Sequence, residues 1–400
     1  MTNDYKPIKI QNAVLRKDGK RVENYIHVFD NRIRKYFKSF NFYAEYDQDV
    51  SDVPLGILNI PALSATINIA WAVGCPIQLG EIDDVYLKGL ECARKVFQTH
   101  ISFKHLSFKT EINAEKIVEN SFGINGKTAL LFSGGLDSTA SHILRKPSET
   151  IMIWGYDIPT HWTEFWRRVI KTYSHLKPII IKTNGMELYD QDLLTQSFQG
   201  DFYVSYWSAF SFSINTLGVC APIATNKVDT VMLASTFPSR HYHYPLHPFA
   251  YRPQLITDQY LGWADIKTFN VENEYDRVEK VKRIIKPKFD EYGPSIIRTC
   301  GNQKGLLSIG EGDLLNCNEC TKCQRTIGAL IVSGINPNLC GFQVKEETYK
   351  KIKKDIMNRE GVYERVRYFW GPIQRNIPSH IEDDFNGSKK FLNWLKGYKL

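Results

Sequence analysis

Four short apolar segments alternate with helical patterns, and this alternation limits the possible folds more than any other feature of the chain. The segments are residues 128–132, 150–155, 178–183 and 229–236. Apolar runs of this length are typical of strands that are buried on both faces of a sheet. The helical patterns between them supply the crossovers that parallel strands require. The sequence therefore predicts an α/β fold with a doubly wound parallel sheet.

A polar turn follows the first of these segments. Residues 132–139 read Phe-Ser-Gly-Gly-Leu-Asp-Ser-Thr, directly after the run Thr128 to Leu131. Glycines at such a turn let backbone N–H groups approach an anion, and the next helix directs its N-terminus at the same point. The hydroxyl groups of Ser133, Ser138 and Thr139 add further donors. The pattern predicts a phosphate-binding loop.

The loop differs from the two commonest nucleotide-binding motifs. It lacks the lysine and the spacing of a Walker A loop, and the adjacent Gly134 and Gly135 do not fit the dinucleotide fingerprint. An aspartate in an anion site repels the anion unless a cation or a capping role compensates. We therefore expect Asp137 to face a magnesium-bound pyrophosphate or to cap the helix that begins there.

The segment Ser133–Ser138 resembles the S-G-G-x-D-S signature of the PP-loop ATP pyrophosphatases. The resemblance implies a sheet of the adenine nucleotide alpha hydrolase type, which binds ATP and breaks its α–β phosphate bond while an acceptor is adenylated. It also implies that Asp137, Ser133 and Ser138 are catalytic. The ATP-binding residues that it implies are Leu131, Phe132, Ser133, Gly134, Gly135, Leu136, Asp137, Ser138, Thr139 and, after the second strand, Tyr156.

Four of the eight cysteines lie close together near the C-terminus, and their spacing indicates a metal site. Cys317, Cys320 and Cys323 form a C-x-x-C-x-x-C motif, with Cys300 upstream. Four thiolates suit a tetrahedral zinc ion, and a site with four protein ligands is closed and structural. An iron–sulfur cluster is the main alternative, although no Cys-Pro follows the motif. Unligated cysteines are the third possibility.

Together, the loop and the cysteines resemble the QueC family, the 7-cyano-7-deazaguanine synthases. Ser133–Thr139 reproduce the family's S-G-G-L-D-S-T, and Thr299-Cys300, Cys317–Cys323 and Arg325 correspond to its zinc cluster, so the likeness covers about residues 128 to 330. It implies ATP, magnesium and zinc as cofactors. It also implies adenylation of 7-carboxy-7-deazaguanine or a similar carboxylate, with release of AMP and pyrophosphate and formation of an amide or nitrile.

The domain organisation is expected to be larger than that of the family. We expect an accessory α+β domain at residues 1–125, the ATP-binding domain with its zinc site at 126–340, and a helical extension at 341–400. Enlarged QueC-like proteins occur in bacterial antiviral systems (Qat and one class of CBASS), where the activated group can pass to a protein amine. This likeness implies a protein partner that is encoded alongside this chain. Formation of a homodimer is a further possibility.

The loop at residues 238–252 is the candidate binding site for the substrate. Arg240 and Arg252 could hold a carboxylate and Tyr244 could stack on a purine-like base. The loop follows the fourth strand, at the sheet edge where α/β proteins bind ligands. A rigid aromatic surface loop is the alternative.

Charge and hydropathy exclude other classes. The net charge of +8 is modest for 400 residues, and the basic cluster at 280–288 is expected to be a solvated helix face, so nucleic acid is not an expected partner. An uncharged stretch at 54–80 is interrupted by polar residues, which favours a buried helix at 62–73 over a membrane span. A cytoplasmic protein is expected. The alternatives are a PP-loop enzyme of the tRNA-thiolation type and a non-catalytic nucleotide-binding scaffold in a defence complex.

Overall fold

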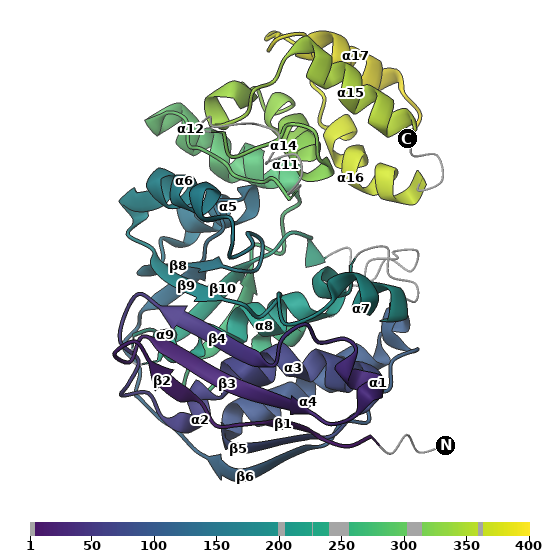
Figure 1. The fold of residues 1–400 in the computed structure, drawn as a ribbon. Helices are drawn as coiled ribbons and strands as arrows, with labels where there is room; N and C mark the ends of the chain where they lie inside the picture. The colour runs from purple at the N-terminus through teal and green to yellow at the C-terminus, as the bar shows by residue number, and fades with distance from the viewer. Residues whose placement is uncertain (1–4, 199–204, 226, 240–255, 302–313, 359–362) are drawn as a thin grey trace.

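The computed structural model describes residues 5–198, 205–225, 227–239, 256–301, 314–358 and 363–400. Its strands are β1 (Ile8–Ile10), β2 (Val14–Arg16), β3 (Arg21–Val28), β4 (Asn41–Tyr46), β5 (Ile77–Asp83), β6 (Ile112–Val118), β7 (Thr128–Leu131), β8 (Glu149–Trp154), β9 (Ile179–Thr183), β10 (Thr230–Ala234) and β11 (Lys267–Val271). All of them belong to one sheet (Figure 1).

The order of the strands in this sheet is β11-β10-β7-β8-β9-β4-β3-β1-β5-β6, with β2 beside β3. Strands β11 to β9 are joined by parallel pairs. Antiparallel pairs then join β9 to β4, β4 to β3 and β3 to β1, and the last two pairs are parallel again. The expected α/β fold with a mostly parallel sheet is confirmed at this level.

Helices cover both faces of the sheet, and alternate residues of β7 show the division. Ala129 and Leu131 belong to one hydrophobic cluster, whereas Leu130 and Phe132 belong to a second cluster. The first cluster packs under α2 (Leu55–Leu58), α3 (Ile60–Val73), α4 (Asp84–Thr99), α8 (Phe212–Gly218) and α9 (Ala221–Ala224). The second packs under α5 (Leu136–Arg145), α6 (Thr163–Tyr173) and α11 (Arg277–Lys280).

The N-terminal residues share the first cluster with the parallel strands. Ala44 of β4 pairs with Thr183 of β9, which makes the sheet continuous across the expected boundary near residue 125. Helix α3 is buried on every side from Ile60 to Ala72 and lies against α8 and the helical turn before it (Trp207–Ser211), where Asn68 Nδ2 donates to the Phe210 carbonyl at 2.9 Å. A helix that is apolar all round needs such a covered position. Residues on both sides of position 125 therefore build one core.

Local expectations from the sequence were mostly met in this half. The helix expected at 62–73 is α3, which ends at Gly74 in the left-handed region (φ 81°). The apolar spacing within residues 83–98 predicts an amphipathic helix, which is α4, and Asp83 caps it by accepting from the Tyr86 N–H at 2.9 Å. The alternation of Phe103, Leu106 and Phe108 predicts a strand, and this prediction is wrong. These phenylalanines are buried around Trp71 and Phe97, and only a short 3-10 turn (Ile101–Phe103) forms there.

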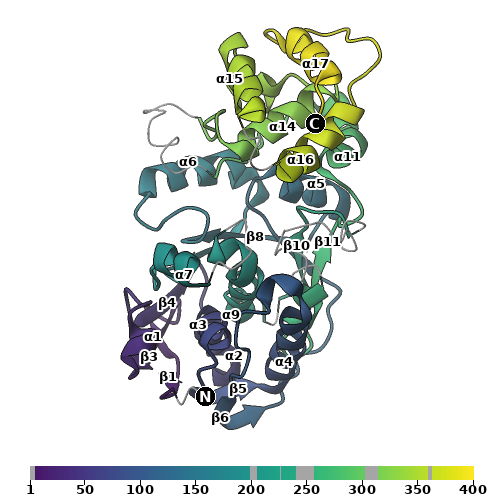
Figure 2. The same cartoon turned by 90° about the vertical axis from the view of Figure 1, so that its right-hand side faces the viewer.

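The C-terminal helices lie at the end of the molecule opposite the N-terminal strands (Figures 1 and 2). They are α14 (Thr321–Ile331), α15 (Glu346–Met357), α16 (Tyr363–Arg375) and α17 (Ser388–Gly397). Trp370 of α16 and Phe391 of α17 are buried in the second cluster. Among the helices of the described residues, none has the length and apolar character needed to cross a membrane.

Candidate functional site

A cavity of about 350 Å³ opens at the carboxyl ends of β7, β8 and β10. Its volume lies within the range of small-molecule sites, and its place at the strand ends is the usual one for α/β sheets. Of the residues predicted from the sequence, those that line the cavity are Leu131, Phe132, Ser133, Gly135, Leu136, Asp137, Ser138 and Tyr156. The glycine turn and the residue after β8 thus face one space.

The remaining predicted residues lie elsewhere. Gly134 and Thr139 are part of the loop and of α5 but do not line the cavity, and Thr139 is buried. Arg240, Tyr244 and Arg252, the candidates for binding the substrate, lie outside the described residues.

The loop needs glycine at position 134. Gly134 has a φ of 74°, a backbone conformation that residues other than glycine rarely adopt. A Cβ atom there would also come within 2.5 Å of the Tyr173 ring. The Tyr173 hydroxyl donates to the Gly134 carbonyl at 3.2 Å. The turn is therefore fixed by close packing against α6.

Hydroxyl groups close the loop onto the start of α5. The backbone N–H of Gly135 donates to Ser133 Oγ at 3.2 Å, and Ser138 Oγ donates to the Gly135 carbonyl at 3.1 Å. Gly135 occupies the N-cap position of α5. The first N–H groups of a helix have no partner within it, and here they begin at the cavity wall. This arrangement suits an anion.

Asp137 lies in the first turn of α5, after the N-cap position that Gly135 occupies without a side-chain cap, so the capping role considered from the sequence for Asp137 is wrong. Its carboxylate accepts from Arg277 Nη2 at 3.0 Å and from Lys280 Nζ at 3.1 Å. Burial by itself raises the pKa of Asp137, but the charges of Lys280 and Arg277 and their hydrogen bonds outweigh it and lower the pKa to about 2. The positive charge that compensates the Asp137 carboxylate in this structure therefore comes from two side chains, Arg277 and Lys280.

Lys280 corrects the expectation for the basic cluster at 280–288. Lys282 and Arg283 are exposed as expected, but Lys280 is fully buried, and its Nζ also donates to the Ser235 carbonyl beyond the end of β10. The sequence carried a signal for this, because Lys280 lies between Val278 and Val281 of the buried stripe. A lysine is therefore present behind the loop, although the loop itself has none.

Arg298 is a second functional residue that the sequence analysis missed. Its backbone N–H donates to the Gly134 carbonyl at 2.7 Å, and its Nη1 donates to the Ser133 carbonyl at 3.0 Å. The side chain is 5% exposed and lines the cavity, while its Nε has no hydrogen-bond partner within the described part of the chain. Lys322 and Arg325 also line the cavity. The wall beside the loop is therefore cationic.

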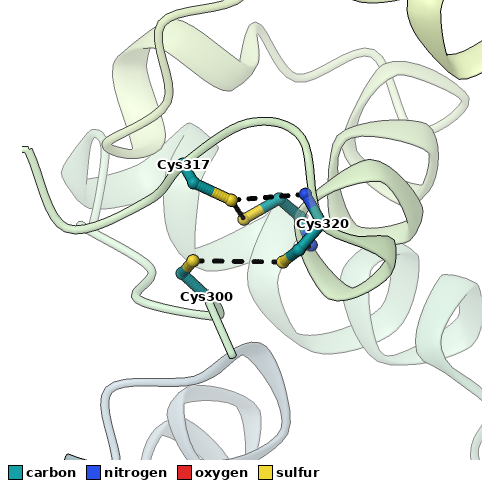
Figure 3. A group of neighbouring side chains, drawn as sticks. Cys300, Cys317 and Cys320 are labelled. Atoms are coloured by element: carbon teal, nitrogen blue, oxygen red, sulfur yellow. Dashed lines mark hydrogen bonds between the residues drawn. The ribbon is translucent and has the colours of Figure 1, made fainter. Parts of the chain in front are cut away.

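The four cysteines meet as the sequence predicted (Figure 3). The sulfur atoms of Cys300, Cys317, Cys320 and Cys323 all lie within 4.8 Å of one another, and the Cys300–Cys320 and Cys317–Cys323 distances are both 3.9 Å. Tetrahedral zinc with Zn–S bonds of about 2.3 Å requires sulfur separations of about 3.8 Å. The cluster can thus hold a metal ion such as zinc.

The cysteine cluster adjoins the cavity through Cys300, which lines it. Buried Asn316, next to Cys317, accepts from the Thr299 N–H at 2.9 Å and donates to the Ile297 carbonyl at 2.7 Å. The two chain segments that carry the cysteines are therefore joined on both sides of Arg298. A metal ion at this position would fasten the same segment that contacts the loop.

Helix α16 in the C-terminal region also contributes to the cavity. Phe369 lines it, and the guanidinium of Arg325 lies 3.6 Å from the centre of the Phe369 ring. Cation–π contacts at this distance hold an arginine in place.

Comparisons of the chain with family models, curated proteins and solved structures give no match.

Proposed function

We propose that the protein is an adenylating enzyme of the PP-loop type, which transfers AMP from ATP to a carboxylate and releases pyrophosphate. The observation that carries the proposal is the Ser133–Ser138 turn at the cavity wall, with the N-terminus of α5 and the Arg298 guanidinium beside it. Backbone N–H groups, a helix N-terminus and an arginine are the donors that phosphate oxygens require.

In the proposed reaction an oxygen of the substrate carboxylate attacks the α-phosphorus of ATP. The bond to the bridging oxygen breaks, and pyrophosphate leaves with the electron pair. The cationic wall with Arg298 and the start of α5 would stabilise the charge that grows on the leaving group. Magnesium would accompany ATP and share that charge. Asp137 would keep Arg277 and Lys280 in place, since it binds both of them.

The proposed substrate is 7-carboxy-7-deazaguanine or a similar planar carboxylate. The cavity has aromatic side chains in its walls, Tyr156, Trp166 and Trp207 on the β8 side and Phe237 beyond β10, which suit the flat rings of adenine and of such a substrate. An amine would then displace AMP from the acyl group. Ammonia, or an amine of a protein partner as in the antiviral systems, is the proposed acceptor.

Zinc is the proposed metal of the cysteine cluster. The sulfur separations of 3.9 Å match one tetrahedral ion, whereas an iron–sulfur cluster places several atoms between its thiolates. With four sulfur ligands the ion would have no open position, so its role would be to hold the segment around Arg298.

Pyrophosphate release tests the proposal. The protein, ATP and magnesium are incubated with and without 7-carboxy-7-deazaguanine, and pyrophosphate is measured. We expect release that depends on the carboxylate and falls at least about 100-fold in Arg298→Met, because one charged donor to the phosphates is lost. Arg167→Met is the matched control, since Arg167 is an exposed arginine of α6 that pairs with the exposed Glu164.

Two other outcomes would point to the alternatives. Binding of ATP without pyrophosphate release under any condition supports a non-catalytic scaffold. Release that requires RNA and a sulfur donor supports a tRNA-thiolation enzyme.

A further inference from the structure

One wall of the cavity carries polar atoms that the adenylation step does not use. Asn270 of β11 lines the cavity beside Leu233 of β10, its partner in the sheet. Its Nδ2 donates to Oδ2 of Asp258 at 2.9 Å. The other end of the amide, Oδ1, is buried and has no hydrogen-bond partner among the described residues. Such an atom costs about 1–3 kcal/mol unless something donates to it.

Asp258 explains why this end of the amide is the acceptor. In this structure Oδ2 of Asp258 accepts from the N–H₂ group of the amide, which leaves Oδ1 on the other side. Asp258 is completely buried, and Thr268 donates to its backbone carbonyl. Burial raises the pKa of this carboxyl to about 7. The fold thus carries a costly buried acid whose side chain orients Asn270.

The sheet order locates Asn270 relative to the phosphate loop. Strand β7, which leads into the loop, lies between β8 on one side and β10 with β11 on the other. Tyr156 and Ile158 follow β8 and line the cavity at that end, together with Trp166. An aromatic and apolar end of this kind suits adenine. Asn270 lies at the opposite end, where the group to be activated would sit.

We propose that Asn270 is a specificity-determining residue whose Oδ1 accepts a hydrogen bond from a ring N–H or amino group of the substrate. Asp258 is the positioning residue that fixes the amide. The substrate class is a planar heteroaromatic carboxylate with an N–H donor on its ring system. This assignment rests on the proposed function, because it deepens the description of the same cavity.

Selection by Asn270 would act through the cost of an unpaired acceptor. A ligand with an N–H donor satisfies Oδ1, whereas a ligand methylated at that nitrogen leaves it buried and unpaired. Sites built to pair a polar group reject analogues that lack it more strongly than apolar pockets reject a missing methyl group. We expect a preference of about 10-fold to 100-fold for the ligand with the N–H group.

Calorimetric binding to the full chain tests the assignment without turnover. The probes are 7-carboxy-7-deazaguanine and its analogues methylated at each ring or amino nitrogen. We expect the wild type to reject at least one analogue by about tenfold or more. Asn270→Ala should bind the parent about tenfold more weakly and lose the discrimination, while its Kd for ATP, measured in the same way, stays within about twofold. Phe269→Ala is the control, because Phe269 is exposed on the same strand.

The variant Asp258→Asn tests whether Asp258 positions the Asn270 amide or only stabilises the fold. An amide at position 258 can donate as well as accept, so either end of the Asn270 amide can face it, and discrimination should fall although the variant has nearly the same shape. This variant also serves if Asn270→Ala does not fold. Discrimination equal to that of the wild type in either folded variant overturns the assignment.

The outcomes also separate this assignment from the proposed function. A wild type that binds none of the probes, or binds all of them equally, overturns the role of Asn270. A wild type that binds and discriminates but never releases pyrophosphate overturns the proposed function and leaves the role of Asn270 standing.

Discussion

The carboxylate of Asp137 and the ammonium of Lys280, 143 residues apart in the chain, form an ion pair at 3.1 Å that is largely removed from solvent. Arg277 completes the group at 3.0 Å. The pair joins the Ser133–Ser138 loop to α11 on the second face of the sheet. Because Lys280 is fully buried, the loss of Asp137 leaves its charge without compensation, whereas the loss of Lys280 leaves Asp137 paired with Arg277 alone.

The first prediction concerns this pair. Asp137→Asn should lower the free energy of unfolding by about 3–5 kcal/mol, because it leaves the buried Lys280 charge unpaired, and Lys280→Met should lower it by less, because Asp137 stays paired with Arg277. The double variant should lose less than the sum of the two, since it removes both partners of the Asp137–Lys280 pair. Denaturant unfolding measures all three. Glu164→Gln, in the exposed pair with Arg167, is the control and should change stability by less than about 1 kcal/mol. Additive losses in the double variant would contradict the coupling.

The second prediction concerns the loop glycine. Gly134→Ala should destabilise the protein and abolish ATP binding, because the new Cβ meets the Tyr173 ring in addition to the strain of φ 74°. Gly123→Ala is the matched control, since Gly123 has a similar φ of 78° but open space around its Cβ. The loss of stability in Gly123→Ala should be limited to the backbone strain, about 1–2 kcal/mol. Equal losses of thermal stability in the two variants would show that contact with Tyr173 is unimportant.

The sequence predicted those features of the candidate site that depend on residues close together in the chain. The turn at 132–139 and the C-x-x-C-x-x-C motif are local patterns, and the structure brings each of them together as expected. The sequence did not reveal how distant segments meet. Arg298 reaches the loop through its backbone and its guanidinium, and no local pattern marks an arginine for such a contact.

The same limit explains why the sequence did not reveal how the strands of the N-terminal half pair. The sequence suggests short strands at residues 8–10 and 25–28, but the pairing of β4 with β9 depends on a register between residues about 140 apart in the chain. The pairing of Asp258 with Asn270 is equally hidden, because an aspartate in a loop is usually exposed. Contacts of this kind are fixed by packing of the whole sheet and not by local preference.

The third prediction is a pH dependence of stability. Burial raises the pKa of Asp258 from 3.8 to about 7 in the folded protein, so the folded state holds this proton more tightly than the unfolded state. The contribution of Asp258 is therefore most favourable below about pH 4 and is lost as the pH rises through about 7. Asp258→Asn removes this dependence.

The Tm of Asp258→Asn relative to wild type measures the effect. The difference should be small near pH 4 and should grow up to pH 8, where the gain in stability is at most on the order of 4 kcal/mol. A difference that does not change between pH 4 and pH 8 would show that Asp258 is ionised throughout.

The fourth prediction links the metal to nucleotide binding. Purified protein should contain about one zinc ion per chain, and Cys320→Ser should lower both the zinc content and the folded yield. Removal of zinc should also weaken ATP binding, because the metal would hold the segment that places Arg298 against the loop. Metal analysis and equilibrium binding of ATP measure the two effects.

Cys92→Ser is the control for this experiment. Cys92 is an exposed cysteine of α4 and lies outside the cluster, so its loss should change neither zinc nor ATP binding. A brown preparation that contains iron would contradict the zinc assignment. Full ATP affinity in folded, metal-free protein would contradict the coupling.

The most direct test of the central claim is the identity of the nucleotide product. The protein is incubated with ATP, magnesium and 7-carboxy-7-deazaguanine, and the products are separated by ion-exchange chromatography. The arrangement of the Ser133–Ser138 loop, Arg298 and Arg277 around one cavity leads us to expect AMP and pyrophosphate in equal amounts. Formation of ADP and phosphate as the only products would show cleavage at the γ-phosphate and would contradict the proposed adenylation.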